Sequence, residues 1–73
     1  EGHLRAPMPG LVLDVRAVAG ATVEAGAILV VLEAMKMEHS LTARWAANVV
    51  EVKVKKGQRV EEGTDLVRLE PAN

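Results

Sequence analysis

Apolar side chains recur at every second position in two stretches of the chain, residues 11–17 and residues 50–55. A period of two is typical of a half-buried β-strand, because successive side chains point to opposite faces of a sheet. The alternating apolar positions are Leu11, Leu13, Val15 and Ala17 in the first stretch and Val50, Val52 and Val54 in the second. Two further short strands are predicted over residues 28–33, which are mostly apolar, and residues 66–70.

The segments between these strands are bounded by glycines, Gly20–Gly26 in one case and Gly57–Gly63 in the other. Both are predicted to be turns with one valine directed inward, because glycine adopts positive φ without a steric penalty. Residues 23–37 are not expected to form a helix, since Gly26 interrupts them and residues 28–31 are mostly β-branched. The chain is therefore predicted to be all-β.

The chain contains an internal repeat. A shift of 37 positions places Gly20–Gly26 on Gly57–Gly63, and Glu33 on Glu70. Other identical pairs are Ala6 with Ala43, Val12 with Val49, Val15 with Val52, Leu29 with Leu66, Val30 with Val67 and Leu32 with Leu69. Two related β units that each expose an apolar face are expected to pack on each other. The repeat thus predicts a small sandwich or flattened barrel with pseudo-twofold symmetry.

The segment Met35–Met37 joins the two copies, between a strand that ends near Ala34 and another over residues 38–43. Strands joined so closely are expected to form a hairpin with Lys36 at or near its tip. A two-residue hairpin favours Asn-Gly or Asp-Gly, yet this tip carries a lysine between two methionines. A local rule broken without structural gain marks a candidate functional site, and methionine can adapt to a partner surface. The competing interpretation places both methionines in the core and leaves the lysine an ordinary solvated one.

Composition narrows the classes of partner. With 73 residues and no cysteine, the chain is expected to be one domain, residues 1–73, without disulfides or a thiolate metal site. The formal net charge is -1, with no basic stripe for nucleic acid, and the longest apolar run, Ala25–Leu32, is too short to cross a membrane. No signal peptide is visible, and residues 1–4 are expected to be the remnant of a linker in a longer protein. The Ala and Val content is compatible with a bacterial cytoplasmic source and equally with a mitochondrial one.

Ala34-Met35-Lys36-Met37 resembles the Ala-Met-Lys-Met signature of the biotin carboxyl carrier (biotinyl) domains of biotin-dependent carboxylases. The stretch Ala6-Pro7-Met8-Pro9-Gly10 resembles the start of such domains in acyl-CoA and pyruvate carboxylases. The resemblance extends over residues 4–70 and includes the glycine spacing and the repeat. It implies a flattened barrel, or barrel-sandwich hybrid, of two four-stranded antiparallel sheets with the modified lysine on an exposed hairpin.

The resemblance also implies the chemistry. Biotin protein ligase is expected to join biotin to Lys36 through an amide, and the tethered biotin to carry a carboxyl group from biotin carboxylase, which uses ATP and bicarbonate, to a carboxyltransferase. Ala34, Met35, Met37 and Glu33 are expected to help partners recognise the hairpin. The domain itself is expected to be monomeric and to catalyse neither half-reaction, because the cofactor carries the chemistry.

Two features bear on the parent enzyme. Residues 4–70 contain no inserted segment of the kind that forms a protruding "thumb" in some bacterial acetyl-CoA carboxylase carriers, so the chain most resembles the C-terminal carrier domain of an acyl-CoA carboxylase alpha subunit. Glu38-His39 resembles methylcrotonyl- or geranyl-type enzymes, but two residues do not identify the molecule that is carboxylated. Ala47 stands where the family commonly has glycine, so the resemblance does not predict the backbone conformation of that turn.

Two other functions are compatible with a hairpin lysine. A lipoyl domain of a 2-oxo-acid dehydrogenase complex has a similar fold, but its usual flanking pattern is Asp-Lys-Ala. An unmodified β adaptor would use the hairpin only for docking. An enzyme is the weakest alternative, since the sequence offers no nucleophile–base pair.

The histidines, a pair of glutamates and the tryptophan are further candidate site residues. His3 and His39 are far apart in sequence and lack cysteine or patterned carboxylate partners, so no metal site is expected. The pair Glu61-Glu62 is expected to be a solvated turn. Trp45, the only aromatic residue, is either a buried anchor or a contact with a parent enzyme.

Overall fold

A computed structural model describes residues 2–72, which form eight β-strands and no helix. In chain order the strands are β1 (His3–Arg5), β2 (Gly10–Val15), β3 (Thr22–Val23), β4 (Ile28–Ala34), β5 (Met37–Thr42), β6 (Ala47–Val52), β7 (Arg59–Val60) and β8 (Asp65–Pro71). None of the described segments could cross a membrane as a helix.

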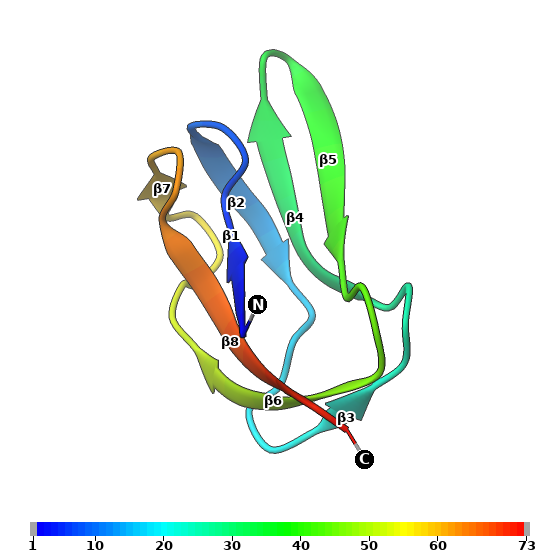
Figure 1. The fold of residues 1–73 in the computed structure, drawn as a ribbon. Coiled ribbons are helices and arrows are strands. Elements are labelled where there is room, and N and C mark those ends of the chain that lie inside the picture. The colour runs from blue at the N-terminus through cyan, green and yellow to red at the C-terminus, as the bar shows by residue number, and fades with distance from the viewer. Residues whose placement is uncertain (1, 73) are drawn as a thin grey trace.

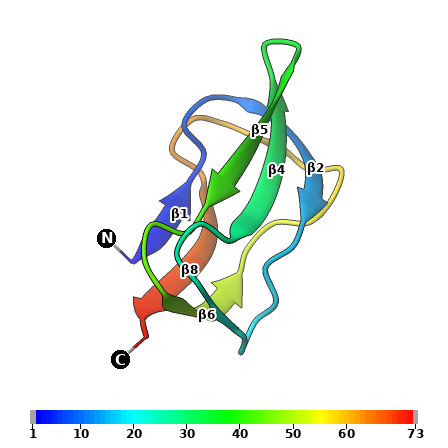
Figure 2. The same ribbon diagram turned by 90° about the vertical axis from the view of Figure 1, so that its right-hand side faces the viewer.

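The strands form two open four-stranded antiparallel sheets, ordered β1-β8-β6-β3 and β5-β4-β2-β7. Figure 1 shows the β4–β5 hairpin projecting beyond the other loops at one end of the molecule, and Figure 2 shows the same projection from the side. The predicted all-β architecture with two four-stranded sheets is confirmed. The segment expected to be a linker remnant, residues 1–4, includes His3 and Leu4, which pair with Arg68 and Val67 of β8.

The two sheets are related by the 37-residue repeat. Adding 37 to the bounds of β2, β3 and β4 gives the bounds of β6, β7 and β8. Backbone bonds repeat as well: the Gly20 N–H donates to the Val49 carbonyl, and the Gly57 N–H donates to the Val12 carbonyl, each at 2.8 Å. Each copy therefore pairs a short strand with the other copy, β3 with β6 and β7 with β2, and the two copies are related by a pseudo-twofold axis.

The core between the sheets is apolar throughout the described residues, with no buried polar or charged side chain. Its fully buried side chains are Val12, Leu29, Val30, Leu32, Val49, Leu66 and Val67. Burial of this aliphatic surface is the main stabilising term for so small a domain. Trp45 lies outside the core, with 39% of its surface exposed.

β-Bulges decide which side of β2 and β6 faces the core. Leu13 is an extra residue between the paired residues Val12 and Asp14, and Val50 has the same position in β6. Because each bulge shifts the alternation by one residue, Val12 and Val49 are buried, whereas Leu13 is half-buried and Val50 is exposed. The alternation read from the sequence holds only after the bulge.

Candidate functional site

The projecting hairpin has the tightest possible connection. Ala34 at the end of β4 pairs with Met37 at the start of β5, so only Met35 and Lys36 lie between the strands. Their φ angles are 55° and 67°, and positive φ at both central residues is the pattern of a type I′ turn. This turn matches the twist of the flanking strands, so it extends the β4–β5 ladder to its tip.

The turn contains no glycine, although its backbone conformation favours one. Left-handed φ brings Cβ of an ordinary residue close to the following carbonyl oxygen, at a cost of roughly 1–2 kcal/mol per residue. All other positive φ angles in the described chain belong to glycines, namely Gly20, Gly26, Gly57 and Gly63. Such strain persists when the surroundings enforce it, here through six paired positions between β4 and β5.

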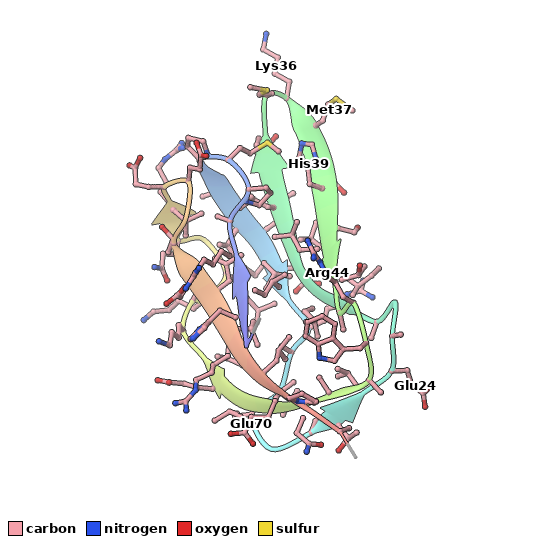
Figure 3. All side chains as sticks on the ribbon, viewed as in Figure 1. Glu24, Lys36, Met37, His39, Arg44 and Glu70 are labelled. Carbon is pink, nitrogen blue, oxygen red and sulfur yellow. The ribbon has the colours of Figure 1, made fainter. Side chains whose placement is uncertain are left out.

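The side chains at the tip are directed into solvent. Met35 is 84% exposed and Met37 is 63% exposed, so neither methionine is a core residue. Figure 3 shows the Lys36 ammonium group at the extreme end of the molecule, directed away from both sheets. Within the described residues Lys36 makes no ion pair or side-chain hydrogen bond. Its amine is therefore open to a partner enzyme from most directions.

His39 supports the base of the hairpin. Its Nε2 lies 3.3 Å from the Ala34 carbonyl oxygen, and because a carbonyl can only accept, Nε2 carries the proton in this contact. The residue pairs with buried Leu32 across the ladder and is itself half-buried. No feature of the sequence predicts this contact between His39 and Ala34.

Gly10 supports the hairpin base from the β2 side. A Cβ at this position would lie 2.5 Å from the Glu33 carbonyl oxygen, closer than side-chain atoms can approach backbone. Glycine therefore lets β2 pass close to the last residues of β4. Its repeat partner Ala47 begins β6 and is fully buried, so the second copy accommodates the methyl group that the first excludes.

A shallow groove of about 390 Å³ opens beside the tip. Its walls include Gly10, Glu33, Met35, Lys36, Arg59 and Glu61. The hairpin thus offers a partner both a projecting lysine and a recess with charged and apolar surfaces.

The structure brings the predicted site residues together in one hairpin. Glu33, Met35, Lys36 and Met37 are exposed, whereas Ala34 is buried, with 5% of its surface accessible. A partner can therefore contact the first four by their side chains and Ala34 only near its backbone. No cluster of metal-ligating side chains is found among residues 2–72.

Comparison with known families matches residues 2–69 to the family described as biotin-requiring enzymes. The alpha subunit of mitochondrial methylcrotonoyl-CoA carboxylase from Arabidopsis thaliana is 44% identical over 68 residues, which are 93% of this chain and 9% of that protein. The biotin carboxyl carrier protein of Streptococcus mutans is 42% identical over 64 residues, which are 88% of this chain and 49% of that protein.

Among solved structures, a single-chain, multi-domain long-chain acyl-CoA carboxylase is similar, with a TM-score of 0.90 and 46% identity. The match covers 97% of this chain and 7% of that chain. The chain therefore spans less than a tenth of the carboxylases that it matches and about half of the carrier protein.

Proposed function

This chain belongs to the family of biotin-requiring enzymes and is a biotin carboxyl carrier domain, and we propose that Lys36 is the residue that carries its biotin. The observation that carries the proposal is the turn itself. Lys36 lies at the outermost point of a hairpin whose strained backbone contains no glycine, and its amine has no partner within residues 2–72.

Attachment requires a nucleophilic amine. In the proposed reaction a biotin protein ligase first forms biotinyl-AMP, and the Lys36 amine, once deprotonated, attacks its acyl carbon. An amide bond forms, the acyl–phosphate bond breaks, and AMP leaves. The exposed tip suits this step, because the ligase can surround the lysine without unfolding any strand.

The scaffold and the arm have different mechanical properties. The ladder of β4 and β5 fixes the lysine Cα, whereas the lysine side chain beyond it is free to rotate. When bound, biotin supplies a ring nitrogen that accepts and releases a carboxyl group. Lys36 would hold that group at high effective concentration for two successive active sites.

The partners follow from the carrier role. We propose a biotin carboxylase and a carboxyltransferase as the two sites, an acyl-CoA as the acceptor and a monomeric state for the carrier domain. Glu33, Met35 and Met37 would contact the ligase through their side chains, and Ala34 would contribute its place in the backbone. The relatives are mitochondrial and bacterial proteins, and we place this chain in a mitochondrial matrix or a bacterial cytoplasm. Fractionation of the source cells followed by streptavidin blotting tests the location.

The attachment site is tested by incubating the protein with a biotin protein ligase, ATP and biotin, followed by peptide mass spectrometry. One biotinyl group is expected on Lys36 and none on Lys36→Arg. The matched control Lys55→Arg, an exposed lysine outside the hairpin, is expected to react like the unsubstituted protein. Biotin on another lysine, or modification by a lipoyl ligase in place of the biotin ligase, would overturn the proposal.

A further inference from the structure

A second surface groove lies away from the hairpin, around the only tryptophan. It has a volume of about 290 Å³ and is lined by His3, Leu4, Arg5, Arg44 and Trp45. A smaller hollow of about 50 Å³ shares most of these residues and extends to Thr42 and Leu69. The two hollows have His3, Leu4, Arg44 and Trp45 in common, and we call them together the Trp45 groove.

The two residues at the centre of this groove differ from their equivalents in the first copy. Trp45 and Arg44 are equivalent to Met8 and Pro7 of the first copy. Met8 is half-buried against the core, whereas Trp45 keeps 39% of its surface exposed. Trp45 therefore leaves apolar surface open to a partner at a position where the equivalent half has a methionine packed on the core.

The groove also contains basic residues that the repeat does not conserve. His3 and Arg5 are equivalent to the uncharged Ser40 and Thr42. Arg5 donates to Asp65 at 2.7 Å, and Lys53 lies 3.9 Å from the same carboxylate. One carboxylate therefore pairs with more than one basic side chain. The groove takes His3 and Arg5 from the first copy and Arg44 from the second, and each of the three has an uncharged equivalent in the other copy.

Arg44 is the cation left for a ligand. Within residues 2–72 it makes no ion pair and no side-chain hydrogen bond, although it lines both hollows of the groove. Its guanidinium can bind a carboxylate with two parallel hydrogen bonds. Tryptophan and arginine are also both enriched among the residues that dominate the affinity of protein interfaces.

The Trp45 groove is far from the lysine tip. It begins at the Thr42 end of β5, which at about 3.4 Å per residue is roughly 17 Å from Met37. Figure 3 shows Lys36 beyond one end of that strand and Arg44 near the other end. A partner seated in the groove would leave Lys36 free to move its cargo.

We propose that the Trp45 groove docks an acidic segment of the carboxylase to which this carrier belongs, with Trp45 as the apolar anchor and Arg44 as the partner of a carboxylate. The carboxylase is available as a partner because the chain is less than a tenth of its carboxylase relatives. The cations are too few, and the net charge of -1 too low, for a nucleic-acid footprint. The inference depends on the carrier role and not on which lysine is modified.

The single tryptophan allows a direct test. Protein labelled with 5-fluorotryptophan gives one ¹⁹F signal, from Trp45, which is recorded while the unlabelled biotin carboxylase and carboxyltransferase components of the same enzyme are added separately. One component is expected to shift the signal, and the affinity is expected to fall as ionic strength rises, because salt screens the Arg44 contact. Arg44→Glu is expected to weaken binding by about tenfold or more, which corresponds to about 1.4 kcal/mol. Lys56→Glu makes the same charge change at an exposed site outside the groove and is expected to leave the affinity unchanged.

Several outcomes would overturn the proposal. One is a ¹⁹F signal that stays unchanged when either component is added, and another is an equal loss of affinity in Arg44→Glu and Lys56→Glu. A third is a shift caused by a single-stranded oligonucleotide instead of a carboxylase component. A fourth is a shift that depends on protein concentration alone, which would indicate a second copy as the occupant. Lys36→Arg is expected to bind as the unsubstituted protein does. If biotin protein ligase does not modify the protein but a carboxylase component still shifts the ¹⁹F signal, the proposed attachment site is refuted and the docking groove is supported.

Discussion

The two copies of the repeat have matching strands and different chemistry. β2, β3 and β4 correspond residue by residue to β6, β7 and β8, and even the bulges recur, at Leu13 and Val50. The copies differ at the hairpin that follows β4 and around Trp45, whose equivalent is Met8. Shared features build most of the core and the turns, and these two differences lie on the surface. Both surfaces to which we assign a function therefore lie where the two copies depart from the internal symmetry.

The turns show the same contrast. In the turns that only connect strands, the positions with left-handed backbone are glycines, namely Gly20, Gly26, Gly57 and Gly63. At the hairpin tip the same backbone region is occupied by Met35 and Lys36. The side chains that we propose for recognition and attachment stand where the backbone favours glycine, and the ladder of β4 and β5 enforces the conformation.

Exchanging the two turn residues should have the largest effect. In the double variant Met35→Lys with Lys36→Met the composition is unchanged but the amine is moved by one position. Because small displacements of a reacting group can cost about 100-fold in rate, we expect kcat/KM for biotinylation to fall by that order or more. Ligase kinetics with labelled biotin measure it. Thermal unfolding should be unaffected, and an unchanged rate would show that the ligase does not read the position of the lysine.

Gly10→Ala should give the largest loss of stability. Its Cβ would meet the Glu33 carbonyl oxygen at 2.5 Å, so β2 and the hairpin base must move apart. Overpacking of this kind lowers the free energy of unfolding by about 1–3 kcal/mol, which urea denaturation measures. The reciprocal change Ala47→Gly, which only removes a buried methyl group from the second copy, should cost less. A larger loss at Ala47 would contradict the difference between the copies.

Gly57→Ala separates backbone strain from packing. Its φ is 89°, and no atom lies within 4 Å of a Cβ built there, so only the left-handed conformation opposes the substitution. We expect the free energy of unfolding to fall by roughly 1–2 kcal/mol. Gly57→Asn should cost less, because asparagine tolerates this region. Equal losses would mean that the side chain meets an obstacle.

Met35→Asn should act in the opposite direction. Asparagine is favoured at the first central position of a type I′ turn, so the free energy of unfolding should rise by about 0.5 kcal/mol. Biotinylation should slow at the same time, because an exposed apolar contact is lost. Urea denaturation measures the expected rise in the free energy of unfolding, and ligase kinetics on the same sample measure the expected fall in the rate of biotinylation. A variant that is more stable and equally good as a substrate would remove Met35 from the recognition surface.

The smallest effect concerns Asp65, whose equivalent in the first copy is the uncharged Ile28. The hydrogen bond from the Arg5 side chain, aided by the nearby charges of His3 and Lys53, holds the pKa of the Asp65 carboxyl below its ordinary value of 3.8. A lowered pKa in the folded state stabilises the fold above the unfolded-state pKa, and this contribution disappears as pH falls through the folded-state pKa. Asp65→Asn should therefore lower the melting temperature slightly at pH 7, and the two proteins should converge below pH 4. A constant difference in melting temperature would contradict this cause.

Much of the fold could be read from the sequence because its signals are local. Alternation, paired glycines and the repeat predicted two β units, and the unusual turn residues predicted an exposed Lys36. The faces of β2 and β6 were not predictable by alternation alone, because a bulge at Leu13 or Val50 depends on pairing with a distant strand. The donor at His39 and the close approach at Gly10 also depend on strands that meet only in the folded chain.

The sequence by itself determined the all-β class, the symmetry and the lysine at the joint between copies, since each follows from periodicity or from residue types at fixed spacing. The tertiary structure alone decided that residues 35 and 36 share a left-handed turn, that Ala34 is buried under its exposed neighbours, and that His3, Arg5, Arg44 and Trp45 line one groove. The turn and the burial of Ala34 depend on how β4 pairs with its neighbours, and the groove depends on segments far apart in the chain, whose distances are set when the two apolar faces close on a common core.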